Sequence, residues 1–289
     1  MKTGRFVALL LIAGLLSGCS AVRFAYNNAD TALRWMADGY LDFEPPQADD
    51  FSARLGNFHS WHRRRELPRY SALLVSASNK LADGLTQEEL DWALDNVNIR
   101  LRAMAEQAAP EMAVVFGKLD PEQIEHMEKK FVETNADFFK EHVKGGETEQ
   151  RKRRMKRNLE LFQDVYGNLS DAQERQLREL SDKLPLLYEL RAHDRVRRQK
   201  EIVALIRENR SSAEFAPKLA HWLANWEEGR APEYQRLTVL HRRQYMQMLL
   251  DLDKGMTAAQ RANAVKRLRK YAEDFRVLAE EGKSASPGS

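Results

Sequence analysis

The sequence has few residues that break helices and only one cysteine. Its 289 residues include 14 glycines, 9 prolines and a single cysteine, while 43% are hydrophobic and 31% are charged. Because charged helix formers are abundant and helix breakers are scarce, this composition predicts an all-α protein. The expected architecture is a multi-helix bundle of antiparallel amphipathic helices joined by short glycine-containing turns.

Sequence motifs of common catalytic sites are also absent. No Glu-x-x-His occurs, which argues against a ferritin-like di-iron bundle, and no His-Glu-x-x-His occurs. Nothing matches a nucleophile elbow, a phosphate loop or a dinucleotide fingerprint. His59, His62 and Glu66 lie one helical turn apart and could hold a metal, but a hydrogen-bonded cluster beside Trp61 is the favoured interpretation. We therefore expect a non-enzymatic protein with no catalytic residue, metal or cofactor, and an uncharacterised envelope hydrolase is one alternative.

The N-terminal apolar run is too short to span a membrane. It extends over residues 6–16 and follows Lys2 and Arg5, which is the pattern of a signal peptide rather than of a helix of about 20 apolar residues. The run ends in Leu16, Ser17, Gly18 and Cys19. This ending resembles the lipobox of bacterial lipoproteins. In that family the cysteine receives a diacylglyceryl group, the peptide is cut just before it, and the new amino terminus is acylated with palmitate or a similar chain.

The lipobox resemblance implies where the protein is found. Residues 1–18 would be a lipoprotein signal peptide, and two or three acyl chains on Cys19 would make membrane attachment effectively permanent. No thiol would then remain for a disulfide, a metal site or a nucleophile. Ser20 follows the cysteine, and lipoproteins without Asp at this position tend to reach the outer membrane, here with the chain facing the periplasm. The alternatives are an ordinary secretory peptide and an uncleaved anchor.

Two further segments suggest a family. The motifs YNNAD (residues 26–30) and WHRRRELPRY (residues 61–70), together with the lipobox, resemble a family of proteobacterial helical lipoproteins of unknown function. The resemblance covers most of the mature chain. It implies a location and a helical fold, but no mechanism.

Four junctions carry the signature of one helix ending and the next beginning. In each, a glycine precedes a Ser, Thr or Asp that has Glu or Gln three residues later, which predicts a left-handed glycine followed by a capping box. These junctions are Gly84 with Thr86 and Glu89, Gly117 with Asp120 and Gln123, Gly167 with Ser170 and Gln173, and Gly255 with Thr257 and Gln260. Their irregular spacing argues against a strict repeat array. We also expect Pro110 and Pro185 to kink or divide their helices.

The first and last of these junctions suggest a second, weaker resemblance. Residues 85–89 and 256–260 are similar to the Leu-Thr-x-x-Gln motif of Spy-type periplasmic chaperones. This similarity implies a chaperone for unfolded envelope proteins as an alternative function.

A helical domain is expected over residues 19–282, with a possible subdivision near 144–147 and a disordered tail over 283–289.

The clearest charge feature follows a flexible turn at residues 144–146. Just after the turn lies a basic stretch that could bind an anionic partner: Arg151, Lys152, Arg153, Arg154, Lys156 and Arg157. A second basic stretch includes Arg191, Arg195, Arg197, Arg198 and Lys200. The alternative is a solvated helix face neutralised by neighbouring glutamates.

These observations combine into one expectation. The chain should be a lipid-anchored periplasmic scaffold that contacts the membrane through its lipid and binds envelope proteins or anionic lipid, not nucleic acid. The sequence leaves its oligomeric state open.

Overall fold

The protein is a helical bundle. The structure, a computed structural model, describes residues 21–284, and no strand occurs among them, which confirms the predicted all-α class. The elements in chain order are α2 (Ala21–Asn27), α3 (Ala29–Leu41), α4 (Pro45–Trp61), the π-helix η1 (His62–Glu66), α5 (Leu67–Ala82), α6 (Gln87–Gly117), α7 (Pro121–Phe138), the π-helix η2 (Phe139–Val143), α8 (Gly146–Tyr166), α9 (Asp171–Asp182), α10 (Tyr188–Asn209), α11 (Phe215–Ala224), α12 (Pro232–Asp253) and α13 (Ala258–Ser284). The predicted signal peptide, the lipobox Leu16–Cys19 and residues 285–289 lie outside the described residues.

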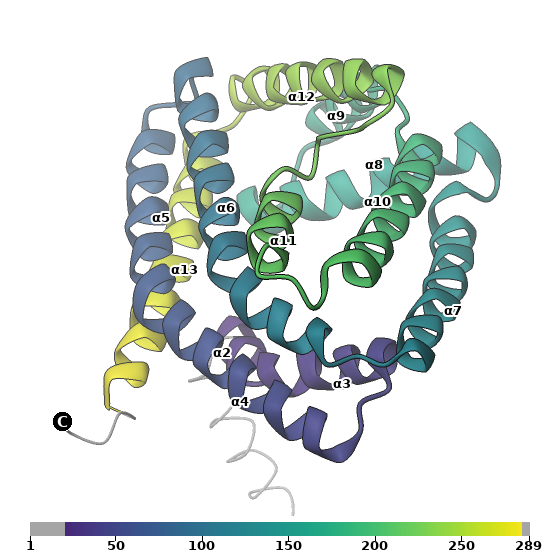
Figure 1. The fold of residues 1–289 in the computed structure, drawn as a ribbon. Helices are drawn as coiled ribbons and strands as arrows, with labels where there is room; N and C mark the ends of the chain where they lie inside the picture. Colours follow the sequence, from purple (N-terminus) through teal and green to yellow (C-terminus); the bar gives the residue numbers. More distant parts are fainter. Residues whose placement is uncertain (1–20, 285–289) are drawn as a thin grey trace, which may run out of the picture.

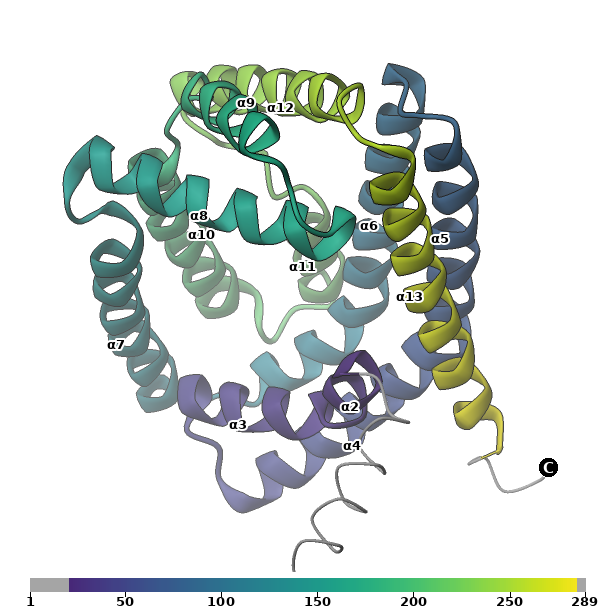
Figure 2. The ribbon, with the colours of Figure 1, turned by 180° about the vertical axis from the view of Figure 1, so that it is seen from behind.

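Most of the helices lie along four edges of the molecule (Figures 1 and 2). Figures 1 and 2 show α5, α6 and α13 side by side along one edge, with α9 and α12 along a second, α7 and α10 along a third, and α2, α3 and α4 along the fourth. In Figure 1, α8 and α11 lie between these edges. Of the described helices, none is both long enough and apolar enough to cross a bilayer.

All four predicted capping boxes form. The side chains of Thr86, Asp120, Ser170 and Thr257 each accept a hydrogen bond from the backbone N–H three residues later, over 2.7–3.3 Å. In return, the Glu or Gln at that later position accepts a hydrogen bond from the backbone N–H of the capping residue. Local sequence therefore determines where these four helices begin.

The predicted left-handed glycine is found at only two of the four junctions. Gly84 and Gly167 have φ of 105° and 83°. Gly117 and Gly255 do not have positive φ, so the prediction is wrong there. At these junctions the backbone N–H groups of Lys118 and Gly255 bond to carbonyl groups three residues back, and a right-handed turn of this kind needs no left-handed residue.

The two proline predictions have different outcomes. Pro185 lies in the connection between α9 and α10, as a helix-dividing proline should. The prediction for Pro110 is a kink or a division, and the division does not occur, because α6 continues through Pro110 to Gly117.

The hydrophobic core has two large clusters. One is formed mainly by α6, α7, α10 and α11 and contains Ala109, Ile206 and Leu219, which are fully buried. The other joins α8, α9, α12 and α13 and contains Leu177, Met248 and Leu252. Both clusters combine residues from before and after the turn at Lys144 and Gly145.

Two pairs of helix N-termini are joined by glutamines. Gln173 and Gln260, the last residues of two capping boxes, are buried and exchange two amide hydrogen bonds of 2.9 Å. Gln173 also donates to the carbonyl group of Gly255, two residues before the capping residue of α13. Gln260 likewise donates to the carbonyl group of Asn168, two residues before the capping residue of α9. The N-termini of α4 and α7 are linked in the same way by Gln47 and Gln123.

Candidate functional site

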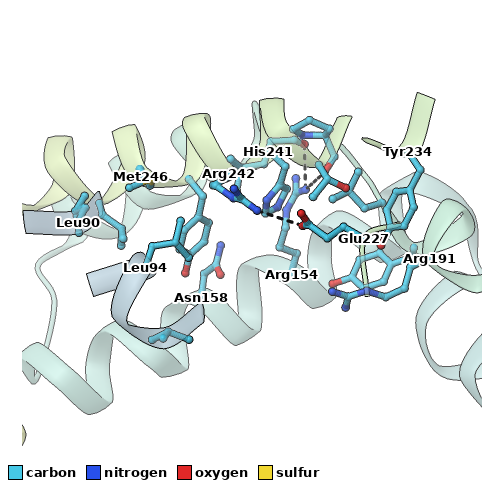
Figure 3. A pocket seen from close by; sticks show the side chains of 18 of the residues that line it. Leu90, Leu94, Arg154, Asn158, Arg191, Glu227, Tyr234, His241, Arg242 and Met246 are labelled. Atoms are coloured by element: carbon cyan, nitrogen blue, oxygen red, sulfur yellow. Dashed lines mark hydrogen bonds and ion pairs between the residues drawn. The ribbon is translucent and has the colours of Figure 1, made fainter. Parts of the chain in front are cut away.

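A cavity of about 650 Å³ lies between α6, α8, α10 and α12 (Figure 3). Its volume is within the range of about 300–1,000 Å³ typical of ligand-binding sites. Side chains from four helices and two connecting segments line it, so the cavity exists only once the bundle is assembled.

One end of the cavity is apolar. In Figure 3, Leu90 and Leu94 of α6 lie at this end together with Met246 of α12. Leu90, Leu94 and Val97 recur at helical spacing, and Val97 remains 53% exposed. Part of the apolar face of α6 therefore borders the cavity instead of being buried against another helix.

Arginines provide most of the charged side chains that line the cavity. Five of them, Arg154, Arg157, Arg191, Arg230 and Arg242, border it, whereas Glu227 is the one carboxylate in the lining. Glu227 accepts from Arg230 over 3.0 Å and from Arg242 over 3.4 Å. In Figure 3, Arg191 lies at the end opposite Leu90. The cavity thus combines an apolar end with an excess of positive charge.

Arg154 and Arg157 are held in place by the end of α9, the connection that follows it and the start of α10. Arg154 is buried and donates to the carbonyl oxygens of Ser181, Leu184 and Pro185 over 2.7–3.1 Å. Arg157 donates to the Tyr188 hydroxyl, and its guanidinium lies 5.5 Å from the centre of that ring. Neither of these contacts neutralises the charge of the arginine.

His241 lies beside these arginines, and its pKa is lowered. Its ring is half-buried and stacks on Tyr245 with ring centres 5.9 Å apart. Burial lowers the pKa of His241 below its ordinary value, and the charges of Arg154 and Arg191 lower it further. Since the field that disfavours another cation favours an anion, the cavity is suited to negative charge. The nearby Thr238 hydroxyl is buried and has no hydrogen-bond partner.

The predicted basic stretch does not form one surface. Arg154 and Arg157 border the cavity, whereas Arg151 bonds to the Asp182 carbonyl group and Glu147. Arg153 donates to the carbonyl groups of His142 and Lys144, Lys156 pairs with Glu160, and Lys152 is exposed. Of the second basic stretch only Arg191 borders the cavity. Sequence reasoning missed Arg230, His241 and Arg242, because no local motif marks them.

The YNNAD and WHRRRELPRY segments, far apart in the sequence, meet in space. The Tyr26 hydroxyl lies 2.9 Å from His62 Nδ1, and Arg63 donates to Asn27 Oδ1 over 2.6 Å. The Tyr26 ring also packs against His59, with ring centres 4.6 Å apart. Burial is the main cause that lowers the pKa values of both histidines.

The same motif cluster includes a buried carboxylate but no metal-binding group. Glu66, at the end of η1, is fully buried and accepts from Arg69 over 2.5 Å. It also pairs with Arg100 over 3.5 Å. Within residues 21–284, no three His, Cys, Asp or Glu side chains come together as a metal site.

The Leu-Thr-x-x-Gln-like residues serve as helix caps. Thr86 and Glu89 close the N-terminus of α6, and Thr257 and Gln260 close that of α13. Their observed hydrogen bonds are therefore internal to the fold.

Comparison with known sequences identifies one family. No curated protein and no solved structure matches the chain. Residues 39–235, well over half of the chain, match a family of unknown function, DUF6279. The matched region includes the WHRRRELPRY motif and most of the cavity lining, while the YNNAD motif precedes it and His241 and Arg242 follow it. As expected from the sequence, the chain belongs to an uncharacterised family, DUF6279.

Proposed function

We propose that this protein is a lipid-anchored envelope protein that binds an anionic amphiphile in the arginine-lined cavity. The observation that carries the proposal is the lining itself, which contains five arginines and one carboxylate and has Leu90 and Leu94 at one end. The ligand class is an acyl or alkyl chain that ends in a carboxylate or a phosphate.

Each end of the cavity contributes a different part of the affinity. A guanidinium group presents a planar set of donors that matches carboxylate and phosphate oxygens. A charge-assisted hydrogen bond of this kind contributes about 1.5–3 kcal/mol. The apolar chain would cover Leu90 and Leu94, and burial of apolar surface contributes about 25 cal/mol per Å². A molecule that has both parts should therefore bind more tightly than either part alone.

Binding, rather than turnover, is the role we assign to the cavity. Glu227 is paired with two arginines, and burial together with the charges of Arg154 and Arg191 lowers the pKa of His241. General acid–base catalysis needs a group that exchanges a proton with the substrate near neutral pH. The Glu227 carboxylate is already occupied by hydrogen bonds from Arg230 and Arg242, so we assign the remaining arginines of the lining to a stationary bound anion.

The proposed location is the periplasmic face of the outer membrane, with attachment through acyl groups on Cys19. This part of the proposal is supported by the lipobox, in which Leu16, Ser17 and Gly18 precede the cysteine. An anchored protein with an amphiphile site could hold or present envelope lipids or acylated envelope molecules, and nucleic acid is not an expected partner.

A titration with matched probes tests the ligand class. The full lipidated chain, reconstituted in nanodiscs, is titrated with octyl phosphate, octanol and inorganic phosphate, with empty nanodiscs as the blank. We expect octyl phosphate to bind at least about tenfold more tightly than either fragment, because each fragment lacks interactions worth about 1.4 kcal/mol or more. Equal affinity for octanol would contradict the role of the arginines, and equal affinity for phosphate would contradict the role of the apolar end.

A charge-matched pair of variants assigns the binding to the cavity. Arg191→Gln removes a cavity cation from an exposed side chain, whereas Lys152→Gln removes the same charge from the outer surface of α8. Octyl phosphate affinity should fall about tenfold in Arg191→Gln, the loss of one charge-assisted bond, and should stay unchanged in Lys152→Gln. Equal losses in both variants would mean that general surface charge, not the cavity, attracts the anion.

A further inference from the structure

Helix α3 carries apolar side chains that the fold leaves uncovered. Leu41 is its only buried residue. Trp35 is 81% exposed, Met36 52% and Leu33 40%, and on the neighbouring α2 Phe24 is 67% exposed. Such large side chains seldom cluster on the surface unless another surface covers them.

Four uncharged, exposed residues of α3 share one face. Ala32, Trp35, Met36 and Gly39 recur at helical spacing, all are exposed, and none carries a charge. The charged residues of α3 form a separate stripe at positions 30, 34 and 38, in which Arg34 pairs with Asp30 over 3.3 Å. The helix is therefore amphipathic, with an uncovered apolar face.

An apolar groove continues this face. The groove has a volume of about 280 Å³, and Leu33 and Met36 line it together with Phe51, Leu55 and Phe58 of α4 and Met112 of α6. The only charged side chains in its lining, Arg54 and Glu111, pair with each other over 2.5 Å. The surface beside α3 thus offers apolar contact without an unpaired charge.

The position of α3 in the chain identifies what covers it. Cys19 lies two residues before Ala21, where α2 begins, and two residues span at most about 7 Å. The seven residues of α2 add only about 10 Å before α3 starts. Figures 1 and 2 show α2, α3 and α4 along one edge of the molecule, opposite α12. A lipid on Cys19 would hold this edge against the bilayer.

We propose that the exposed face of α3 docks on the phospholipid bilayer to which the chain is anchored. Tryptophan favours the membrane–water interface because its ring is apolar and its N–H is polar. Amphipathic helices at this interface bury their apolar face by about 5–10 Å. The inference rests on the acyl anchor of the proposed function, and it adds that the body of the protein is oriented, with α3 toward the lipid and α12 away from it.

Labels at single positions test this orientation in the full lipidated chain. Acylation consumes the Cys19 sulfur, so an introduced cysteine carries the only reactive thiol. A bimane label is attached to Trp35→Cys or to the control Val239→Cys, which is on α12 and 55% exposed. Both sites are exposed, so neither substitution removes a core contact. The labelled chains are reconstituted in vesicles of phosphatidylethanolamine and phosphatidylglycerol that contain brominated lipid.

Docking predicts opposite quenching at the two positions. The label at position 35 should be quenched by brominated lipid at least about twofold more than the label at 239, since the α3 face would lie within the interface. Aqueous iodide should show the reverse order. Equal quenching of both labels by lipid, or equal accessibility to iodide, would overturn the proposal.

Failure of the anchor can be distinguished from failure of docking. The intact mass of the chain reports whether Cys19 is acylated. If Cys19 is unmodified, the proposed anchor is wrong, and cosedimentation with the same vesicles decides docking instead. Binding that Trp35→Asp weakens at least about tenfold would then support the α3 face as a bilayer-binding surface, and undiminished binding would overturn it.

Discussion

The paired glutamines should behave as one energetic unit. Gln173→Ala removes four hydrogen bonds to oxygen or nitrogen groups: two with the Gln260 amide at 2.9 Å, one to the Gly255 carbonyl group at 2.8 Å, and one from the Ser170 N–H at 2.9 Å. It also removes a weak contact with the Met256 sulfur at 3.8 Å. At about 1 kcal/mol net for each bond, with part of the loss recovered by water, we expect the free energy of unfolding to fall by about 3 kcal/mol. Gln260→Ala should have a similar effect.

A double-mutant cycle isolates the contact between the two amides. Two of the four bonds are shared, so the double variant should be less destabilised than the sum of the single variants by about 2 kcal/mol. Urea unfolding followed by circular dichroism gives each free energy from its midpoint and slope. The exposed Gln163 serves as the control, and Gln163→Ala should cost less than about 0.5 kcal/mol.

Additive effects of the two single substitutions would refute the contact between the amides. If the two single effects add to within about 0.5 kcal/mol, the amides do not interact, and the reciprocal arrangement is wrong. Gln47 and Gln123, which have the same set of bonds at the other pair of helix N-termini, should reproduce the coupling. Coupling at one pair and not at the other would show that the two arrangements are not energetically equivalent.

Four further predictions concern the anchor, a turn and the cavity. Cys19→Ala should move the protein from the membrane to the soluble or unprocessed fraction, and wild-type processing and fractionation would contradict the anchor. Gly167→Ala should destabilise the fold by about 1 kcal/mol, because Gly167 has a φ of 83°. Gly255 does not have a positive φ, so Gly255→Ala should destabilise the fold less. Equal urea midpoints for the two variants would contradict this prediction. The His241 pKa lies below its ordinary value of 6.5 in the folded chain. The stability that the neutral ring contributes to folding is therefore present above pH 6.5 and is lost as pH falls through the folded pKa. His241→Gln should make the free energy of unfolding less dependent on pH in this range. Octyl phosphate in the cavity should raise the His241 pKa measured by NMR, and an unchanged pKa would place the anion elsewhere.

The amino-acid sequence by itself determined the class of the fold and the starts of several helices. Helix-forming composition and apolar spacing predicted the all-α bundle, and the capping boxes at Thr86, Asp120, Ser170 and Thr257 form as predicted. These features depend on residues within one helical turn of each other, so a single sequence is sufficient to find them.

Tertiary structure decided the site. The basic stretch at 151–157 is adjacent in sequence, but its side chains point in different directions around α8, and only Arg154 and Arg157 border the cavity. The other lining arginines come from α10, α12 and the segment between α11 and α12. Likewise, sequence reasoning recognised Gln173 and Gln260 as separate caps, and only packing brought their amides together. Contacts between helices depend on how apolar faces pack across long sequence separations, and neither local propensity nor spacing encodes them.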